Sequence, residues 1–146
     1  MKLSQESFYG IQVMVALAQQ GDPDRPVAAD EIARSRGLPQ NFVAKILQKL
    51  TRSGLVVSSR GRQRGYALTT SPDRVTVRQI LEVTEGSDRF RRCYFWPRRC
   101  SEESPCLLHG VGAATRAELE SRLGTLTLAD IALKGRGCAW TDPTTL

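Results

Sequence analysis

Three cysteines and the only histidine of the chain fall within residues 93–109. They follow the spacing C-x6-C-x5-C-x2-H and are Cys93, Cys100, Cys106 and His109. Thiolates and imidazoles are the ligands that Zn²⁺ and iron–sulfur clusters take in proteins. Four such groups in one short segment are enough to hold one metal centre. We therefore expect residues 87–109 to form a cysteine-rich loop around a metal, with the rest of the chain arranged on either side of it.

The residues around the cysteines indicate how the loop presents them. Ser104 can cap a helix and Pro105 can open one, which would place Cys106 and His109 one turn apart on the same face. Nearby arginines and a helix N-terminus favour thiolate over thiol. The alternatives are a Cys3His zinc site, an iron–sulfur cluster and three unliganded cysteines. The gaps are wider than those of zinc knuckles and differ from those of a ferredoxin, so the spacing supports zinc and iron–sulfur equally.

Three helices are predicted ahead of this loop. Residues 7–20 are apolar almost all round, so the first helix is expected to be buried or shared between subunits. Residues 28–36 form a short second helix that Gly37 ends. Pro39 suits the first turn of a third helix, residues 40–53, because its missing N–H would have no partner there. Two helices joined by such a tight turn are typical of a helix-turn-helix.

The third helix separates into two faces. Five apolar residues recur at helical spacing and are expected to pack inward: Phe42, Val43, Ile46, Leu47 and Leu50. The opposite stripe carries amides, cations and one small residue: Asn41, Ala44, Lys45, Gln48 and Arg52. Such groups can contact base edges and phosphates in a major groove, although an ordinary solvated face has the same composition. Together with Pro39 and Gln40 at the helix start, this stripe is the candidate DNA-reading surface.

A β-hairpin is predicted after the third helix, and it favours DNA contact over a merely solvated face. Residues 55–59 and 66–69 have strand character, and the loop between them carries three arginines: Arg60, Arg62 and Arg64. Arginines at such a tip can enter a narrow minor groove. The net charge of +6 and the pI near 9.5 agree with a polyanionic partner. The order of helix, turn, helix and hairpin predicts a winged helix-turn-helix over residues 1–86.

The remaining elements complete a mainly α fold with one small β-hairpin wing. A fourth helix is capped by Thr76 with Gln79 and ends at Gly86. Its inner stripe is expected to contain Val77, Ile80, Leu81 and Thr84. This helix is expected to brace the wing against the cysteine-rich loop.

A long helix is predicted behind the loop, and residues 105–133 include it together with a short last helix. One stripe of the long helix carries Leu108, Val111, Thr115 and Leu119, and small residues beside it allow a second helix to approach closely: Gly110, Gly112, Ala113 and Ala114. We expect a dimerisation helix, the alternative being packing within one subunit. Thr127 and Asp130 can cap the last helix, residues 128–133. Residues 134–146, with Cys138, are expected to be disordered.

Some function classes are excluded by what the chain lacks. An enzyme is not expected, because there is one histidine and neither a nucleophile motif nor a glycine-rich phosphate loop. No apolar run approaches the roughly 18 residues needed to cross a bilayer, and the N-terminus lacks a signal-peptide pattern. We expect a cytoplasmic protein without a membrane partner. In that reducing compartment clustered cysteines are metal ligands or redox thiols more often than disulfides.

The order of these parts resembles the IscR/NsrR/RirA group of winged helix-turn-helix iron–sulfur transcription regulators. The resemblance covers residues 1–133 and rests on the following segments: Met1-Lys2-Leu3-Ser4, residues 27–33, Gly54-Leu55-Val56, Arg60-Gly61, Gly65-Tyr66-Ala67-Leu68, and the three cysteines ahead of a long helix. It implies a homodimer that binds a pseudo-palindromic operator in double-stranded DNA, with recognition helices in successive major grooves. It also implies that Cys93, Cys100 and Cys106 bind an iron–sulfur cluster.

Within this group the pattern is nearest to the IscR-like branch. There a histidine three residues after the last cysteine completes a [2Fe-2S] site, and His109 has that position; a [4Fe-4S] cluster is the alternative. Ala44 stands where that branch carries a glutamate that restricts the operators of the cluster-free form. The resemblance implies a regulator whose operator binding the cluster controls in response to iron or cluster status, redox or nitric oxide. The alternatives are a zinc- or thiol-based redox-responsive regulator and a small iron–sulfur electron-transfer protein.

Overall fold

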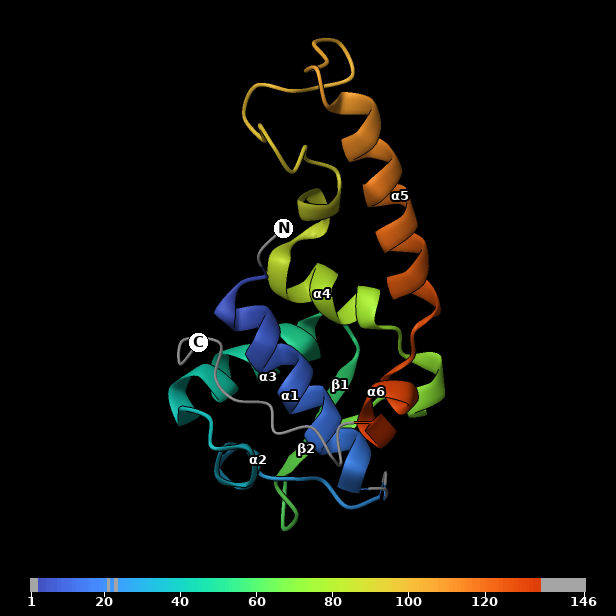
Figure 1. The fold of residues 1–146 in the computed structure, drawn as a ribbon. Coiled ribbons are helices and arrows are strands. Elements are labelled where there is room, and N and C mark those ends of the chain that lie inside the picture. Colours follow the sequence, from blue (N-terminus) through green and yellow to red (C-terminus); the bar gives the residue numbers. More distant parts are fainter. Residues whose placement is uncertain (1–2, 21, 23, 135–146) are drawn as a thin grey trace.

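Helix α1 runs through the middle of the computed structural model, and the other elements are arranged around it (Figure 1). The structure describes residues 3–20, 22 and 24–134. In chain order the elements are α1 (Gln5–Gln20), α2 (Ala29–Arg36), α3 (Gln40–Arg52), β1 (Val56–Ser59), β2 (Gly65–Leu68), η1 (Pro72–Arg74), α4 (Val77–Glu85), η2 (Ser87–Phe90), α5 (His109–Thr125) and α6 (Leu128–Lys134). Figure 1 shows an elongated molecule, with the hairpin at one end and the loop between η2 and α5 at the other.

Helix α1 is buried on nearly every side, as its apolar sequence predicted. Val13 and Met14 have no exposed surface, and only the two ends of the helix reach solvent. The helix packs against α2, α3, α4 and α6 and against strand β2. Because every face of α1 is covered by another element, it forms the centre of the core.

Helices α2 and α3 form the predicted helix-turn-helix. Gly37 ends α2 with φ 62°, a left-handed conformation that glycine adopts without steric cost. Pro39 occupies the N-cap of α3, not the first helical turn as predicted. Its carbonyl oxygen accepts hydrogen bonds from the N–H groups of Phe42 and Val43, at 3.1 Å each. A capping residue has an extended ψ, and the ψ of 126° at Pro39 fits that role.

The two faces of α3 agree with the sequence pattern except at one position. Val43, Ile46, Leu47 and Leu50 are buried, as expected from their spacing. Phe42 was expected inside but is 46% exposed. It lies at the edge of the apolar stripe, where its ring meets Tyr9 of α1 edge-on at 5.7 Å between centroids. The periodicity placed Phe42 on the correct side of the helix, but only the part of the side chain that meets Tyr9 is covered.

The wing is a two-stranded antiparallel hairpin. Val56 pairs with Leu68 and Ser59 pairs with Gly65. A bridge between Val27 and Tyr66 extends the hairpin toward the segment before α2. At Gly65 a Cβ atom would lie 2.8 Å from the backbone of Val27, so only glycine permits this approach. The wing is therefore fixed to the segment before α2 at the end of the hairpin next to its loop.

Helix α4 connects the head to the cysteine-rich loop. The predicted capping box is present, because Thr76 and Gln79 each hydrogen-bond the other's backbone N–H. The four residues of its expected inner stripe are all buried: Val77, Ile80, Leu81 and Thr84. Gly86 has φ 83° and changes the chain direction into η2.

Helix α5 begins at His109, four residues later than Pro105 would allow, so the prediction of a helix opened by Ser104 and Pro105 is wrong. Residues 101–104 close a turn instead, in which the N–H of Ser101 bonds the carbonyl oxygen of Ser104 at 3.2 Å. The N–H of Cys106 points to the sulfur of Cys100 at 3.4 Å. The first contact occupies the carbonyl oxygen of Ser104, which would accept the first hydrogen bond of a helix starting there.

Helix α6 carries the predicted capping box at its start. The N–H of Asp130 bonds the hydroxyl of Thr127 at 3.2 Å, and the N–H of Thr127 bonds the carboxylate of Asp130 at 3.0 Å. The helix extends through Lys134, and the rest of the predicted disordered tail, with Cys138, lies outside the described residues. Among the described ranges, no helix combines the length and apolarity needed to span a membrane.

The closest approach of α1 and α4 gives a test of this packing. A Cβ atom at Gly10 would lie 2.7 Å from Cγ2 of Thr84, which is 7% exposed. We expect Gly10→Ala to lower the free energy of unfolding by about 1–3 kcal/mol because the helices must separate. Urea denaturation followed by circular dichroism measures this change. Gly110→Ala in α5 is the control, since nothing lies within 4 Å of its Cβ position, and unchanged stability of Gly10→Ala would contradict the contact.

Candidate metal centre and nucleic-acid interface

The three cysteine sulfurs of the loop lie together. The Sγ atoms of Cys93, Cys100 and Cys106 are all within 4.8 Å of one another, and all three thiols are free. Cys93 is buried, whereas Cys100 and Cys106 are partly exposed. Cys93 and Cys106 are thirteen positions apart in an irregular segment, yet their sulfurs converge on one point. Three ligands of one metal centre require this arrangement.

Buried neighbours and backbone bonds hold the cysteines in place. Cys93 follows η2, whose last residue, Phe90, is 2% exposed and anchors the start of the loop in the core. The N–H of Cys100 bonds the carbonyl oxygen of Trp96 at 3.0 Å, which closes a turn between the first two cysteines. Cys106 is held by the contact of its N–H with the sulfur of Cys100. Local turns, not a helix, bring the thiols together.

Of the three cysteines, His109 contacts Cys100. Its Nδ1 lies 3.2 Å from the sulfur of Cys100. Its Nε2 lies 3.4 Å from a carboxylate oxygen of Glu102, and its side chain is 19% exposed. The three sulfurs form the compact group, and the imidazole lies at its margin. A carboxylate on the far nitrogen is the arrangement that orients many metal-binding histidines.

The protein environment shifts the pKa values of Cys93 and Cys100 in opposite directions. The backbone N–H groups of Trp96 and Phe95 stabilise the Cys93 thiolate and lower its pKa, despite the burial of this side chain. At Cys100 the N–H of Cys106 also favours the thiolate, but burial and the nearby sulfurs of Cys106 and Cys93 together raise the pKa. The pKa of Cys93 is lowered as expected, but by loop N–H groups and not by arginines or a helix N-terminus, and the pKa of Cys100 is raised against the expectation. A bound metal would remove this difference, because every thiol that ligates a metal must be deprotonated.

The donor set fits a soft metal. Zinc–thiolate bonds of about 2.3 Å in a tetrahedral site place two sulfurs roughly 3.8 Å apart. The 4.8 Å limit on the present sulfur separations is close to this value. Thiolates with one imidazole are also accepted by iron–sulfur clusters. The residues present thus fit either type of centre.

Tyr94 packs the loop against α5. Arg116 and Glu120 of that helix act on its hydroxyl group electrostatically, and burial raises its pKa. Among the described residues the buried hydroxyl oxygen meets no hydrogen-bond partner. An unpaired buried hydroxyl costs stability, so the loop is held there by the aromatic ring and not by the polar group.

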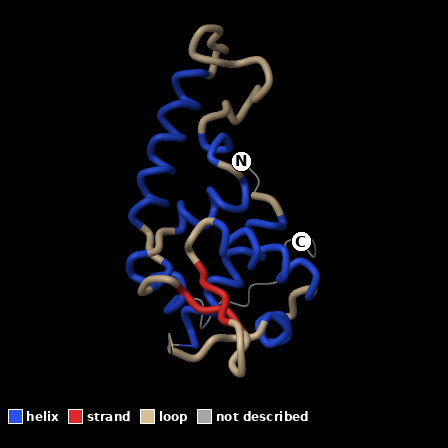
Figure 2. The backbone as a smooth tube through the Cα atoms, turned by 180° about the vertical axis from the view of Figure 1, so that it is seen from behind, coloured by secondary structure: helices blue, strands red, loops and turns tan. Residues whose placement is uncertain are grey.

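The candidate DNA-reading residues are found on or before α3 and in the hairpin loop, and nearly all of them are exposed. Pro39, Gln40, Asn41, Lys45, Gln48 and Arg52 are exposed on or before α3, and Ala44 is half-buried. Arg60, Arg62 and Arg64 are exposed in the hairpin loop. Figure 2 shows the hairpin and the cysteine-rich loop at opposite ends of the tube. The structure therefore separates the candidate metal centre from the candidate DNA surface.

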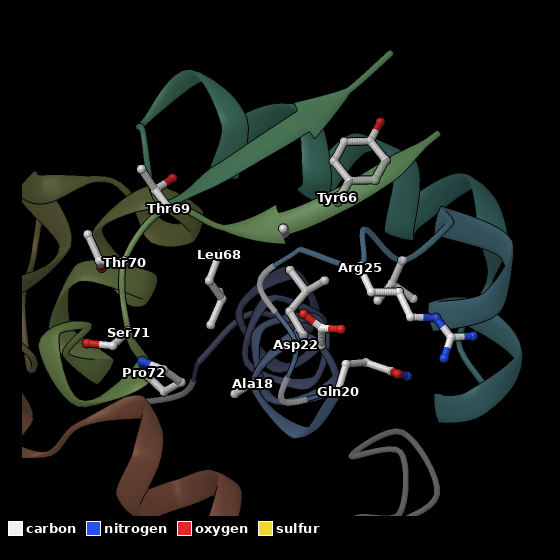
Figure 3. A pocket seen from close by; sticks show the side chains of 13 residues that line it. Ala18, Gln20, Asp22, Arg25, Tyr66, Leu68, Thr69, Thr70, Ser71 and Pro72 are labelled. Atoms are coloured by element: carbon white, nitrogen blue, oxygen red, sulfur yellow. The ribbon is translucent and has the colours of Figure 1, made fainter. Parts of the chain in front are cut away.

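A cavity of about 380 Å³ lies at the base of the wing, and its lining residues precede the three cysteines in the sequence by more than twenty positions. Figure 3 shows that its lining side chains come from the end of α1, the following loop, β2 and the turn before η1. Leu17, Ala18, Val27 and Leu68 form its apolar wall. It holds no cysteine or histidine, so it is separate from the candidate metal centre.

A buried polar contact between α1 and α4 was missed in the sequence. The carboxylate of Glu85 accepts hydrogen bonds from the N–H of Ser4 at 2.6 Å and from the hydroxyl of Ser7 at 2.7 Å. Ser7 has no exposed surface. Ser7, a polar residue on a helix expected to be buried, indicates a buried polar contact in the sequence but does not identify Glu85 as its partner.

Comparison with known proteins identifies a family. The family model Rrf2, described as "Iron-dependent Transcriptional regulator", matches residues 3–134. The structure of T. potens IscR has a TM-score of 0.73 and 31% identity, and the match covers 97% of this chain and 92% of that one. CymR (YrzC), the global cysteine regulator of B. subtilis, has a TM-score of 0.76 and 27% identity, over 92% and 98% of the two chains. The IscR transcriptional regulator of Aliivibrio salmonicida is 25% identical over 131 residues, 90% of this chain and 77% of its own.

The unpaired hydroxyl of Tyr94 gives a test of the loop packing. We expect Tyr94→Phe to raise the free energy of unfolding by about 1 kcal/mol, because the ring remains and the unpaired group is removed. Thermal and urea denaturation of the metal-free protein measure the change. Tyr9→Phe is the matched control and should lose stability, since the Tyr9 hydroxyl accepts a hydrogen bond from Gln5 at 2.8 Å. A loss of stability in Tyr94→Phe would show that the hydroxyl has a partner.

Proposed function

Because the chain belongs to the Rrf2 family of iron-dependent transcriptional regulators, we propose that it is a homodimer whose operator binding is controlled by an iron–sulfur cluster. The family and the winged-helix fold make the protein a DNA-binding transcription regulator. The expectation that it is not an enzyme is confirmed by the same relatives. The cluster, its signal and the operator are the proposed parts.

The convergence of the three thiols is the observation that carries the proposal. Cys93, Cys100 and Cys106 would hold the cluster, and His109 would be the fourth ligand because its Nδ1 already lies 3.2 Å from the sulfur of Cys100. Two relatives named IscR support a metal or cluster site in this chain. A [2Fe-2S] cluster is favoured by the single histidine, and [4Fe-4S] is the alternative. When bound, the cluster supplies a group whose charge and integrity depend on iron supply, oxidants or nitric oxide.

An exposed apolar surface at the start of α5 supports the homodimer. Leu107 is fully exposed, Val111 is 64% exposed and Leu108 is 39% exposed. Phe95 and Trp96 of the loop, each 47% exposed, lie beside this end of the helix, where Phe95 contacts the position of Gly112. Exposed apolar residues gathered in this way mark an interaction surface. A second copy of the chain would cover it in a two-fold arrangement.

The DNA surface fits the groove contacts of a winged helix-turn-helix. In this proposal α3 enters the major groove with Asn41, Lys45 and Gln48, while Arg52 contacts phosphate. The wing arginines Arg60, Arg62 and Arg64 reach a flanking minor groove. The half-buried Ala44 and the helix start at Pro39 and Gln40 allow close approach to the bases.

The position of the thiols indicates how they would control the DNA surface. Cys93 follows η2, which continues from α4, and Cys106 precedes α5. Holding both sulfurs together fixes the path from the head to the proposed dimer helix. When the sulfurs are released, α5 and α4 are joined only by a flexible loop and their packed faces. The two recognition helices of a dimer then lose their fixed relative position.

A zinc- or thiol-based redox-responsive regulator is the second candidate. The compactness of the three sulfurs favours it, because sulfurs that all lie within 4.8 Å of one another can be drawn to a single ion. A relative named CymR, described as a global cysteine regulator, also belongs to this group of structures. The small electron-transfer protein weighed from the sequence gains no support from these relatives.

Metal analysis separates the candidates. Protein purified without oxygen is expected to contain about two irons and two sulfides per chain, with visible absorption that His109→Ala changes. Glu103→Gln is the control, because it alters an exposed charge of the same loop. About four irons per chain would replace [2Fe-2S] by [4Fe-4S]. Stoichiometric zinc without iron would refute the cluster and support the second candidate.

Operator titration tests the control of DNA binding. Operators selected by the protein from a random duplex pool are titrated with cluster-loaded and cluster-free protein, with an expected affinity difference of at least about tenfold, or 1.4 kcal/mol. Arg62→Gln should weaken binding and reduce the salt slope by about one. Arg122→Gln on α5 is the matched control, because this exposed arginine is far from the wing in the chain. Equal affinities of the two forms for every selected operator would contradict cluster control.

A further inference from the structure

If the cysteine-rich loop controls α3, as the proposed function requires, a chain of contacts must connect the two. The inference below concerns that connection and rests on the proposed function. The loop and the wing lie at opposite ends of the molecule (Figure 1). The first turn of α1 lies beside the end of α4 and also packs against α3. Polar contacts at this turn make the connection specific.

Glu85, the last residue of α4, holds the start of α1. One carboxylate oxygen accepts from the N–H of Ser4 at 2.6 Å and from the hydroxyl of Ser7 at 2.7 Å. Since a carboxylate only accepts, Ser7 must donate to it, and the Ser7 oxygen is then free to accept from Thr84 at 2.7 Å. The hydroxyl of Ser4 caps α1 by accepting from the N–H of Ser7 at 3.1 Å. A single carboxylate thus fixes the first turn of α1.

This contact is buried. The Glu85 side chain is 5% exposed, and Ser7 has no exposed surface. Burial raises the pKa of Glu85, but the hydrogen bonds from Ser4 and Ser7 outweigh it, so the pKa lies below its ordinary value. A buried charge that keeps its ionised form depends on all of its partners. Movement of one partner therefore weakens the interactions that the carboxylate makes with the others.

The second carboxylate oxygen faces the cysteine side. It lies 3.6 Å from Nε of Arg89, which belongs to η2. Phe90 and Cys93, the next buried residues, are 2% and 4% exposed. Cys93 is thus three residues beyond the end of η2, and a shift of Cys93 that is transmitted along this short segment would move Arg89 relative to the carboxylate.

The first turn of α1 also contacts the DNA-reading helix. Glu6 forms an ion pair with Lys49 of α3. Tyr9, one turn later, meets the ring of Phe42 at the start of α3 with 5.7 Å between centroids. Glu6 and Tyr9 are within five residues of Ser4. The start of α1 that Glu85 holds is therefore also the part of the helix that contacts α3.

We infer that Glu85 is a positioning residue that couples the cysteine-rich loop to the recognition helix α3 through the first turn of α1. The connection runs from Cys93 through η2 and Arg89 to Glu85, then through Ser4 and Ser7 to the contacts of Glu6 and Tyr9 with α3. The step from Cys93 to Arg89 follows the chain, and the steps from Arg89 to α3 are an ion pair, hydrogen bonds and a ring contact between described residues.

Glu85→Gln tests the coupling with little loss of packing. Glutamine keeps an acceptor oxygen for Ser4 and Ser7 but removes the charge that attracts Arg89. The measured quantity is the ratio of operator affinities of the cluster-loaded and cluster-free forms. We expect this ratio to fall toward one in Glu85→Gln, while Glu82→Gln, one turn earlier on α4 and paired with Arg78, keeps the wild-type ratio. A wild-type ratio in folded Glu85→Gln would overturn the inference.

Arg89→Gln approaches the same contact from the other side and covers the case that Glu85→Gln fails to fold. It should reduce the affinity ratio as well, and the double variant should show no further reduction, because both changes remove one contact. Additive losses in the double variant would overturn the proposed connection.

Hydrogen exchange of the cluster-free protein gives a readout that does not depend on the cluster. Glu85→Gln is expected to speed amide exchange both in residues 4–9 and at the start of α3, whereas Glu82→Gln leaves both segments unchanged. Faster exchange confined to residues 85–93 would overturn the inference. If the wild-type affinity ratio is one but exchange changes as expected, cluster control fails and the connection through Glu85 stands.

Discussion

The structure depends on the burial of one helix whose surface is apolar on almost every side. Helix α1 cannot be stable in water alone, and four helices and a strand of the wing cover it. Gly10 allows α4 to approach closely, and the few polar groups on α1 are satisfied by neighbours such as Glu85. The DNA-reading helix and the helix leading to the cysteines therefore share one support. The winged head and the cysteine-rich loop become parts of one packed unit through it.

The fold could be predicted to a large extent because its signals are local. The spacing of Val43, Ile46 and Leu50 predicted the buried face of α3, and the capping box of Thr76 and Gln79 predicted the start of α4. The errors occurred where distant contacts decide the structure. Phe42 follows the apolar spacing, but the rest of the chain covers only the edge that meets Tyr9.

The candidate site was predictable in its residues and not in its geometry. The spacing of the cysteines and His109 indicated one centre, and the structure brings the three sulfurs together. The start of α5 was misplaced, because Ser104 and Pro105 match a helix start while the backbone near them bonds Cys100 and Ser101 instead. Glu85 could not be identified, since its partners Ser4 and Ser7 are about eighty residues earlier and sequence periodicity does not report such pairs. The roles of the ligands and of the DNA-facing residues stay predictions.

The elongated shape, with wing and cysteines at opposite ends, affects how quickly a regulator of this form can respond. DNA that occupies the wing leaves the far end in contact with bulk water, and Cys100 and Cys106 are partly exposed there. A small oxidant, chelator or gas molecule can then reach the sulfurs while the protein is on its operator. In the proposed regulator, the chemistry at the thiols would then set the speed of the response, and the residence time on DNA would not.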